Sequence, residues 1–248
     1  MKKEELLKKI ENFVKDTIST FHEKRLEKLM SIRLLDIMKR KNPYLYKAKG
    51  LNTAYEIVKQ IVDDFLTAHE ETIFGNWLED LAIFVCSKAF GGVKSSAQGI
   101  DLEFERDGKR YFVSVKSGPN WGNSGQIREM VMNFKKIWSR LPSAERHRSV
   151  FVEGCCYGRC GVQVKENFYY KYCGKDFWEL ISGIETLYVD IVEPIGRQAR
   201  EKSEKYLEEY KNLLNRITGE FIRLFCEENG SVNWEKVLKY TSTKDYKV

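Results

Sequence analysis

The stretch from Gly99 to Lys116 decides the fold, and it reads Gly-Ile-Asp-Leu-Glu-Phe-Glu-Arg-Asp-Gly-Lys-Arg-Tyr-Phe-Val-Ser-Val-Lys. Two runs of alternating apolar and polar residues flank the dipeptide Asp107-Gly108. Asp-Gly favours a two-residue type I′ turn, because that turn needs positive φ at both central residues. The stretch therefore predicts a β-hairpin in which Arg106 faces Lys109 and Phe104 faces Tyr111.

This register places three polar side chains together. Asp101 falls opposite Ser114, and Lys116 lies two residues further along the same strand. Residues that face each other, or that lie two apart on one strand, share a face of the sheet. We therefore expect a carboxylate, a hydroxyl and an ammonium to meet at the open end of the hairpin, as they would in a functional site.

The composition predicts a folded protein. The 248 residues are 42% hydrophobic and 13% aromatic, which is enough for a sizeable core. No apolar run has the length of a membrane span, and the lysine-rich start lacks the apolar stretch of a signal peptide, so we expect a cytoplasmic protein with no membrane partner. The net charge of +6 is compatible with a polyanionic partner and equally with ordinary solubility.

Helical and alternating periodicities surround the hairpin. They predict an α/β (α+β) fold in which a central mixed β-sheet is flanked by helices. Helices are expected at 2–21, 52–68, 73–90, 124–140, 175–182, 196–227 and 233–240, and a further helical pattern runs up to the basic cluster at 39–41. Strands are expected at 149–154, 167–173 and 186–191.

The hairpin chemistry resembles a known enzyme superfamily. Asp101, followed by Ser114-Val115-Lys116, resembles the PD-(D/E)XK nucleases, in which an acid at the start of one strand precedes (D/E)-X-K on the next. Two further stretches resemble type II restriction endonucleases, in particular the branch that cuts interrupted palindromes of the GGNCC type. They are Lys116-Ser-Gly-Pro-Asn-Trp-Gly-Asn-Ser-Gly-Gln126 and Cys173-Gly-Lys-Asp-Phe-Trp-Glu-Leu-Ile-Ser-Gly183.

The resemblance implies a role for each matching residue. Asp101 matches the acid that binds Mg²⁺, and the backbone carbonyl of Val115 matches an additional ligand. Lys116 matches the lysine that activates the attacking water and stabilises charge on the phosphate. Ser114 stands where the family has Asp or Glu, and a neutral hydroxyl is a weaker ligand for Mg²⁺ than a carboxylate.

Three explanations of this departure are open. Ser114 acts through a metal-bound water, or Glu103 supplies the missing charge from the same strand face, or Glu79 supplies it from the preceding helix. We expect Glu79, because some members of the superfamily use a helix acid. Glu79 is therefore predicted as a catalytic and metal-binding residue, together with Asp101.

The resemblance also implies organisation and partners. It predicts a single endonuclease domain over 1–248, with a helical N-terminal part at 1–70, a catalytic core at 71–192 and a helical C-terminal part at 193–248. Cutting both strands of a palindrome needs two sites related by a twofold axis, so a homodimer on double-stranded DNA is expected. A cognate DNA methyltransferase belongs to such a system without direct contact. Rival functions are a structure-specific repair or recombination nuclease and a catalytically inactive DNA-binding protein.

The loop after Lys116 is rich in Gly, Pro, Asn and Ser, which is turn chemistry, and Ser124 is the expected N-cap of the next helix. Because the loop borders the site, its polar residues are candidates for contacting DNA: Asn and Gln can read adenine, and Arg can read guanine. An equal alternative to DNA contact is a compact loop in which Trp121 packs against the protein itself. The DNA-binding candidates are Asn120, Trp121, Asn123, Ser124, Gln126, Arg128 and Arg159.

Four of the six cysteines cluster between Cys155 and Cys173, and four thiolates can hold zinc. Adjacent Cys155 and Cys156 replace the usual spaced pair, which argues against a zinc site. In a cytoplasmic protein we expect all the cysteines to be reduced thiols.

Overall fold

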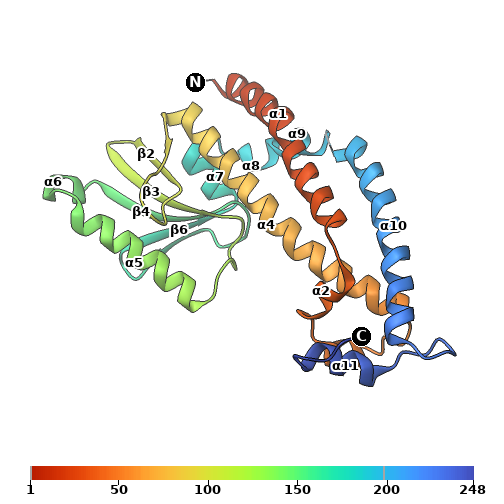
Figure 1. Cartoon of the computed structure of the whole chain (residues 1–248). Coiled ribbons are helices and arrows are strands. Elements are labelled where there is room, and N and C mark those ends of the chain that lie inside the picture. Colours follow the sequence, from red (N-terminus) through yellow and green to blue (C-terminus); the bar gives the residue numbers. More distant parts are fainter. Residues whose placement is uncertain (1, 198) are drawn as a thin grey trace. The chain divides into compact units, whose positions relative to one another are not determined.

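The computed structural model describes residues 2–197 and 199–248, without the side chains of 199–203 (Figure 1). Its elements follow the expected order of helices, hairpin, and further helices and strands. They are α1 (Lys3–Met30), α2 (Leu34–Met38), α3 (Pro43–Ala48), α4 (Ala54–Phe90), β1 (Val93–Lys94), β2 (Leu102–Arg106), β3 (Lys109–Lys116), α5 (Ser124–Arg140), α6 (Ser143–Arg146), β4 (Ser149–Cys155), β5 (Val162–Lys165), β6 (Tyr169–Cys173), α7 (Lys175–Ser182), α8 (Leu187–Asp190), α9 (Val192–Arg197), α10 (Ala199–Phe225) and α11 (Trp234–Ser242).

Two local predictions are wrong. The helices expected at 52–68 and 73–90 form the single helix α4, because the residues between them include no proline or glycine to interrupt it. The strand expected at 186–191 is the short helix α8. Leu187 and Ile191 are buried four residues apart, which is helical spacing, and the Thr186 hydroxyl donates to Asp190 at 2.8 Å.

The chain forms two compact units. The first contains Met1–Ser19 with Phe74–Gln198, and the second contains Thr20–Ile73 with Ala199–Val248. Helix α1 begins in the first unit and ends in the second, and α4 runs in the reverse order. The single domain over 1–248 stays a prediction, since compactness alone does not say whether the units fold separately.

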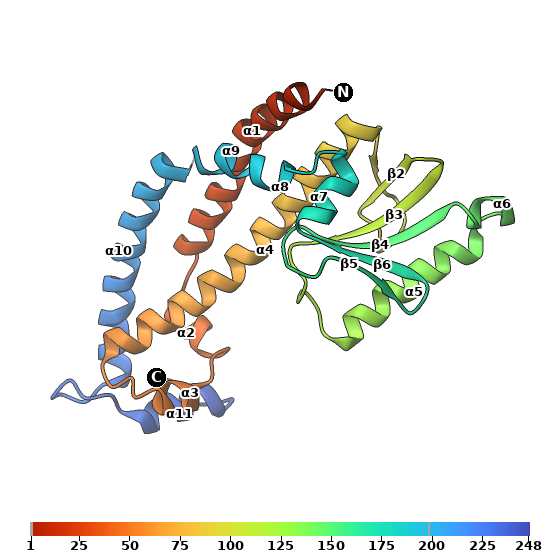
Figure 2. The same cartoon turned by 180° about the vertical axis from the view of Figure 1, so that it is seen from behind.

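The first unit contains the six-stranded sheet, in the order β1-β2-β3-β4-β6-β5. Strands β1, β2 and β3 are antiparallel, β3, β4 and β6 are parallel, and β5 is antiparallel to β6. Helices cover both faces, with α5 on one side and α4 and α7 on the other (Figures 1 and 2). The expected α+β class with a mixed central sheet is confirmed.

Aromatic contacts hold these layers together. On the α5 face, Phe134 packs against Phe151 and Tyr169 with ring centroids 5.3 and 5.8 Å apart. On the opposite face, Phe90 of α4 stacks on Phe104 of β2 at 6.0 Å. Further from the sheet, Phe13 of α1 stacks on Phe84 of α4 at 4.3 Å. Neighbouring residues of β3 contribute to different layers, because Phe112 belongs to the cluster on the α5 face, whereas Tyr111 stacks on Phe104 at 4.7 Å.

The second unit is helical. Its core joins α2, α3, α10, α11 and the parts of α1 and α4 within it, and includes Leu29, Ile61 and Phe221. Near this core, the Tyr206 hydroxyl donates to Glu70 at 2.9 Å, and Arg25 pairs with the same carboxylate. Among the described residues of both units, no helix is long and apolar enough to cross a membrane.

The expectation that all cysteines are free thiols is wrong for two of them. Cys160 and Cys173 form a disulfide between the segment before β5 and the end of β6. The two residues are separated by 13 positions and flank the hairpin of β5 and β6, in which Val162 pairs with Tyr172. Cys86, Cys155 and Cys226 are free and buried, as is Cys156.

Reduction of this disulfide is expected to lower the free energy of unfolding by about 2–3 kcal/mol, because the bridge restricts the unfolded chain. Urea unfolding of the wild type with and without a reductant measures the difference. The matched control is Cys160→Ser, whose unfolding midpoint should not respond to the reductant. Equal wild-type midpoints under both conditions would contradict the prediction.

Candidate active site

The hairpin has the predicted register. Arg106 pairs with Lys109, Phe104 with Tyr111, and Leu102 with Val113. Its turn residues Asp107 and Gly108 have φ of 52° and 72°, the positive values that a type I′ turn requires. The next pair beyond Leu102 and Val113 is Asp101 with Ser114, so the local pattern places these two residues opposite each other.

Asp101 is the centre of the site. Its carboxylate oxygen Oδ2 accepts from the backbone N–H of Val115 at 2.7 Å and from the Ser114 hydroxyl at 3.4 Å. Lys116 Nζ lies 3.7 Å from the same oxygen. The three predicted side chains therefore meet at the open end of the hairpin. Ser114 is buried, whereas the side chains of Asp101 and Lys116 are 22% and 23% exposed.

Glu79 reaches this site from α4. Burial is the main cause that raises the pKa of Glu79, and the negative charge of Asp101 raises it further. Lys94, whose Nζ lies 3.5 Å from Glu79, opposes the shift. Glu79 is therefore close enough to Asp101 for the two carboxylates to repel each other, an arrangement that a divalent cation would relieve.

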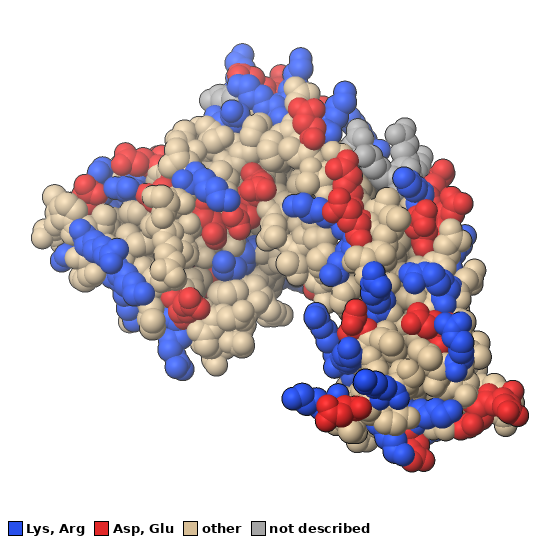
Figure 3. Space-filling model, viewed as in Figure 1, with Lys and Arg blue, Asp and Glu red and all other residues tan. Residues whose placement is uncertain are grey.

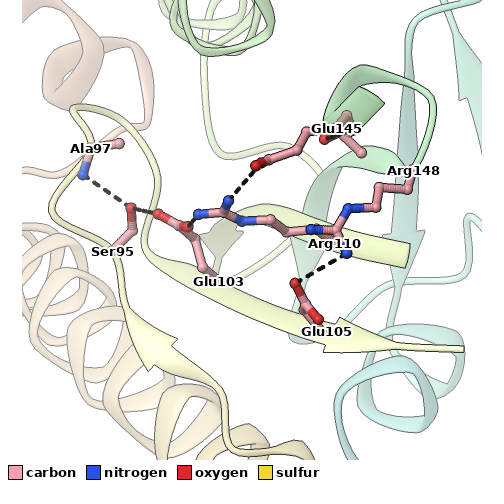
Figure 4. Close-up of polar contacts among 8 residues, drawn as sticks. Ser95, Ala97, Glu103, Glu105, Arg110, Glu145 and Arg148 are labelled. Atoms are coloured by element: carbon pink, nitrogen blue, oxygen red, sulfur yellow. Dashed lines mark hydrogen bonds and ion pairs between the residues drawn. The ribbon is translucent and has the colours of Figure 1, made fainter. Parts of the chain in front are cut away.

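Glu103 is engaged elsewhere (Figure 4). One of its carboxylate oxygens lies 2.9 Å from Arg110, and the other accepts from the Ser95 hydroxyl at 2.5 Å. Arg110 also pairs with Glu145 of α6 at 3.1 Å, so this network joins the hairpin to the segment before β4. Because Arg110 neutralises Glu103, Glu79 is the better candidate for the charge missing at Ser114.

The donors around Asp101 suit Mg²⁺. Among the described residues, no group of three or more His, Cys, Asp or Glu side chains is arranged to hold a metal, zinc included. Mg²⁺ does not need such a cage, because it is held through one or two carboxylates, waters and substrate phosphates. The assignment of Asp101 and Glu79 as these two carboxylates stays a prediction, as does the carbonyl of Val115 as a further ligand.

The loop after Lys116 begins α5 with a reciprocal cap. Asn123 Oδ1 accepts from the N–H of Gly125 and Gln126 at 2.9 and 3.1 Å, and Gln126 Oε1 accepts from the N–H of Asn123 at 2.9 Å. The N-cap is therefore Asn123, and the prediction of Ser124 is wrong because Ser124 is already the first helical residue. Asn123 and Gln126 thus have a structural role in addition to any contact with DNA.

The other predicted DNA contacts are spread over the surface of the first unit. Asn120, Ser124, Arg128 and Arg159 are exposed, whereas Trp121 is partly buried. Lysine and arginine side chains follow α5 (Figure 3). Arg128, Lys136 and Arg140 are among the exposed residues of this helix. A basic, exposed helix next to the site is compatible with a polyanionic substrate.

Sequence reasoning missed a buried ion pair next to the site. Glu153 of β4 and Lys171 of β6 lie 2.7 Å apart, and their side chains are only 4% and 13% exposed. Glu153 is paired with Ser114 in the sheet. The available signal was a glutamate that directly follows the apolar run Val150-Phe151-Val152 in a strand expected to be buried, where an acid needs a partner.

Comparison with protein families decides the class of the chain. The family model of the type II restriction endonuclease EcoO109I matches residues 8–203. The chain belongs to this family. The matched region contains the hairpin and both stretches that resemble restriction endonucleases, so the predicted relationship is confirmed. Comparison with curated protein sequences gave no match.

Membership in the EcoO109I family makes the chain a restriction endonuclease by class, with DNA as its substrate class. The family match covers parts of both compact units, because it begins within α1 and ends within α10.

Replacing Glu79 by glutamine is expected to raise the free energy of unfolding at pH 7. The raised pKa means that the folded state binds the proton more tightly than the unfolded state, so the ionised carboxyl costs stability at neutral pH. The gain should shrink as the pH falls below the pKa of an ordinary carboxyl, where Glu79 is neutral in both states. Urea unfolding of both proteins at pH 7 and pH 4 measures this.

The matched control is Asp80→Asn, because Asp80 is exposed and also lies near Lys94, at 3.9 Å. It should leave the unfolding midpoint close to that of the wild type. The negative charge of Asp101 contributes to the raised pKa of Glu79. Glu79→Gln should therefore raise the free energy of unfolding by less in a protein that already carries Asp101→Asn. A less stable Glu79→Gln protein at pH 7 would show that the pairing with Lys94 outweighs the repulsion.

Proposed function

We propose that this protein is an Mg²⁺-dependent type II restriction endonuclease that hydrolyses double-stranded DNA. Its site is a GGNCC-like palindrome, and its products carry 5′-phosphate ends. The observation that supports this most directly is the convergence of Asp101, Ser114 and Lys116 at the open end of the hairpin. Glu79, which lies within electrostatic reach of Asp101, supplies the second carboxylate.

Asp101 and Glu79 would hold the metal ion, with the carbonyl of Val115 as a further ligand. When bound, Mg²⁺ polarises the scissile phosphate and lowers the pKa of a water molecule. The N–H of Val115 and the hydroxyl of Ser114 both donate to Asp101 Oδ2, which keeps that carboxylate in one orientation. Ser114 therefore acts through Asp101 in this proposal, and Glu79 replaces the charge that Ser114 lacks.

Lys116 acts on the phosphate. Its ammonium stands next to the carboxylate that would hold the metal, so it can orient the attacking water and stabilise the negative charge that develops on the phosphate. Attack in line with the leaving oxygen needs no covalent enzyme intermediate. The 3′-oxygen leaves as the 3′-hydroxyl of one fragment, and the phosphate stays on the 5′ end of the other fragment.

DNA is held by residues around this site. We propose that DNA contacts the exposed residues Asn120, Ser124, Arg128 and Arg159. It also contacts the side-chain NH2 groups of Asn123 and Gln126, which the capping hydrogen bonds do not use. A homodimer would present two sites to the two strands of a palindrome. The cognate methyltransferase would protect the same sequence without touching this protein.

Incubation of the purified protein with a plasmid of known sequence and Mg²⁺ tests the proposal. Discrete fragments are expected, and sequencing of their ends gives the recognition site and the cut position. EDTA in place of Mg²⁺ is the control and should abolish cleavage. Cleavage of only branched or single-stranded DNA would overturn the proposal in favour of a structure-specific nuclease.

A DNA-binding protein without nuclease activity is the second candidate, because Ser114 replaces the acid of the family pattern. It predicts binding to duplex DNA with no Mg²⁺-dependent cleavage. A mobility-shift experiment beside the digestion separates the two candidates, since only the nuclease gives both a complex and fragments.

A further inference from the structure

A buried charge network supports the loop that follows Lys116. Register pairs Ser114 of β3 with Glu153 of β4, and Glu153 with Lys171 of β6, so the three residues form a row across one face of the sheet. Lys116 lies on the same face, two residues beyond Ser114. Burying the ion pair of Glu153 and Lys171 is costly, and such a pair is weak evidence for stability.

Both charges of the pair reach into the loop 117–123. Glu153 Oε1 accepts a hydrogen bond from the indole N–H of Trp121 at 2.8 Å. Lys171 Nζ donates to the carbonyl of Pro119 at 2.9 Å. One side-chain contact and one backbone contact thus attach the loop to β4 and β6.

The indole ring in turn contacts Lys116. Lys116 Nζ lies 4.9 Å from the centroid of the Trp121 ring, which is within the range of a cation–π interaction. The same nitrogen lies 3.7 Å from Asp101 Oδ2. The ammonium is therefore held by a carboxylate and by an aromatic ring.

The main chain at Lys116 is fixed independently of this network. The N–H of Cys156 donates to the carbonyl of Lys116 at 2.9 Å, and the N–H of Tyr157 donates to that of Ser117 at 3.1 Å. The remaining freedom is that of the long lysine side chain, which has several rotamers to lose. Trp121 is placed to restrict that side chain.

We propose that Trp121, held by Glu153 in a loop that Lys171 fixes at Pro119, is a positioning residue for the ammonium of Lys116, an inference that rests on the proposed function. Its indole N–H is used by Glu153 and does not read a base. The compact-loop alternative for Trp121 is thereby preferred over its prediction as a DNA contact. The network acts on the rate of bond cleavage and leaves the affinity for DNA unchanged.

Three variants separate the parts of the network. Trp121→Leu removes the ring, Trp121→Phe keeps a ring and loses the N–H, and Glu153→Gln keeps an acceptor and loses the charge. The matched control is Trp138→Leu, because Trp138 lies on α5 and is 42% exposed. Single-turnover cleavage with saturating protein gives the rate, and binding of the same DNA in EDTA gives the affinity.

Trp121→Leu is expected to lower the cleavage rate about 10- to 100-fold, the size of effect that a misplaced catalytic group produces. Its affinity for DNA should stay within about twofold of the wild type, a difference no larger than the usual error in adding the free-energy effects of independent substitutions. Trp121→Phe and Glu153→Gln should each fall between Trp121→Leu and the wild type, because each keeps a ring and weakens its attachment to residue 153. Trp138→Leu should match the wild type.

A wild-type rate for Trp121→Leu would overturn the inference, as would a loss that lies entirely in the affinity. Reductive methylation read by mass spectrometry supplies a test that needs no cleavage. Lys116 should be modified faster in Trp121→Leu and Glu153→Gln than in the wild type, while Lys109 is unchanged. If Lys116 is methylated at the wild-type rate in both folded variants, the inference is wrong. If the variants are methylated faster at Lys116 but the wild type cleaves no plasmid, only the proposed function is wrong.

Discussion

Asp101→Asn is expected to lower Mg²⁺-dependent cleavage about 10³-fold or more, because a metal ion supplies several kcal/mol of transition-state stabilisation. Asparagine is the informative change. Its side-chain oxygen can still accept from the N–H of Val115, which in the wild type lies 2.7 Å from Asp101 Oδ2. The fold is kept while the charge that holds the metal is removed. Single-turnover cleavage of a plasmid at saturating protein measures the effect.

The hairpin offers a matched control at its other end. Asp107→Asn makes the same chemical change in the turn, where Asp107 has φ of 52° and asparagine tolerates that conformation. Its side chain is 80% exposed, so the cleavage rate should not change. Cleavage by Asp101→Asn within tenfold of the wild type would contradict the assignment of Asp101, and the metal would then depend mainly on Glu79.

Lys116→Met should lower the cleavage rate about 10²- to 10³-fold, the size of effect that follows the loss of one group stabilising transition-state charge. Methionine keeps a flexible apolar stem of similar length and removes the ammonium. Affinity for DNA in EDTA should change little, since a single positive charge is lost from a protein with 42 Lys and Arg residues. The measurement is again the single-turnover rate, with affinity determined separately.

Lys109→Met is the control for Lys116→Met, because Lys109 is an exposed residue at the opposite end of the same strand. It should cleave at the wild-type rate. If Lys116→Met lost affinity and kept its rate, Lys116 would be a phosphate-binding residue with no part in the chemical step. Combining Lys116→Met with Asp101→Asn should cost less than the product of the single effects, because residues that act as a unit are not additive.

The hairpin was predictable because its information is local. A two-residue Asp-Gly turn determines the register, and strict alternation then determines which residues share a face. Asp101, Ser114 and Lys116 meet for this reason, and the sequence stretch contains everything needed to infer it. The α+β class followed in the same way from helical and alternating periodicity. The N-cap at Asn123 was missed by one residue, since Asn and Ser are both good caps.

The remaining features depend on contacts between distant residues. From the sequence, Glu79 was preferred over Glu103 only because some members of the superfamily use a helix acid, and the pairing of Arg110 with Glu103 supports that preference. The buried pair of Glu153 and Lys171 and the disulfide of Cys160 and Cys173 likewise arise from strand pairing and loop return.

The sequence by itself therefore determined the hairpin, its register and the positions of Asp101, Ser114 and Lys116, because a short turn and a period of two are local properties of the chain. The tertiary structure decided which acid stands near Asp101 and which tryptophan covers Lys116. Glu79 belongs to α4, and Trp121 is held by Glu153 of β4. No local pattern encodes contacts between segments that meet only when the sheet and its helices pack.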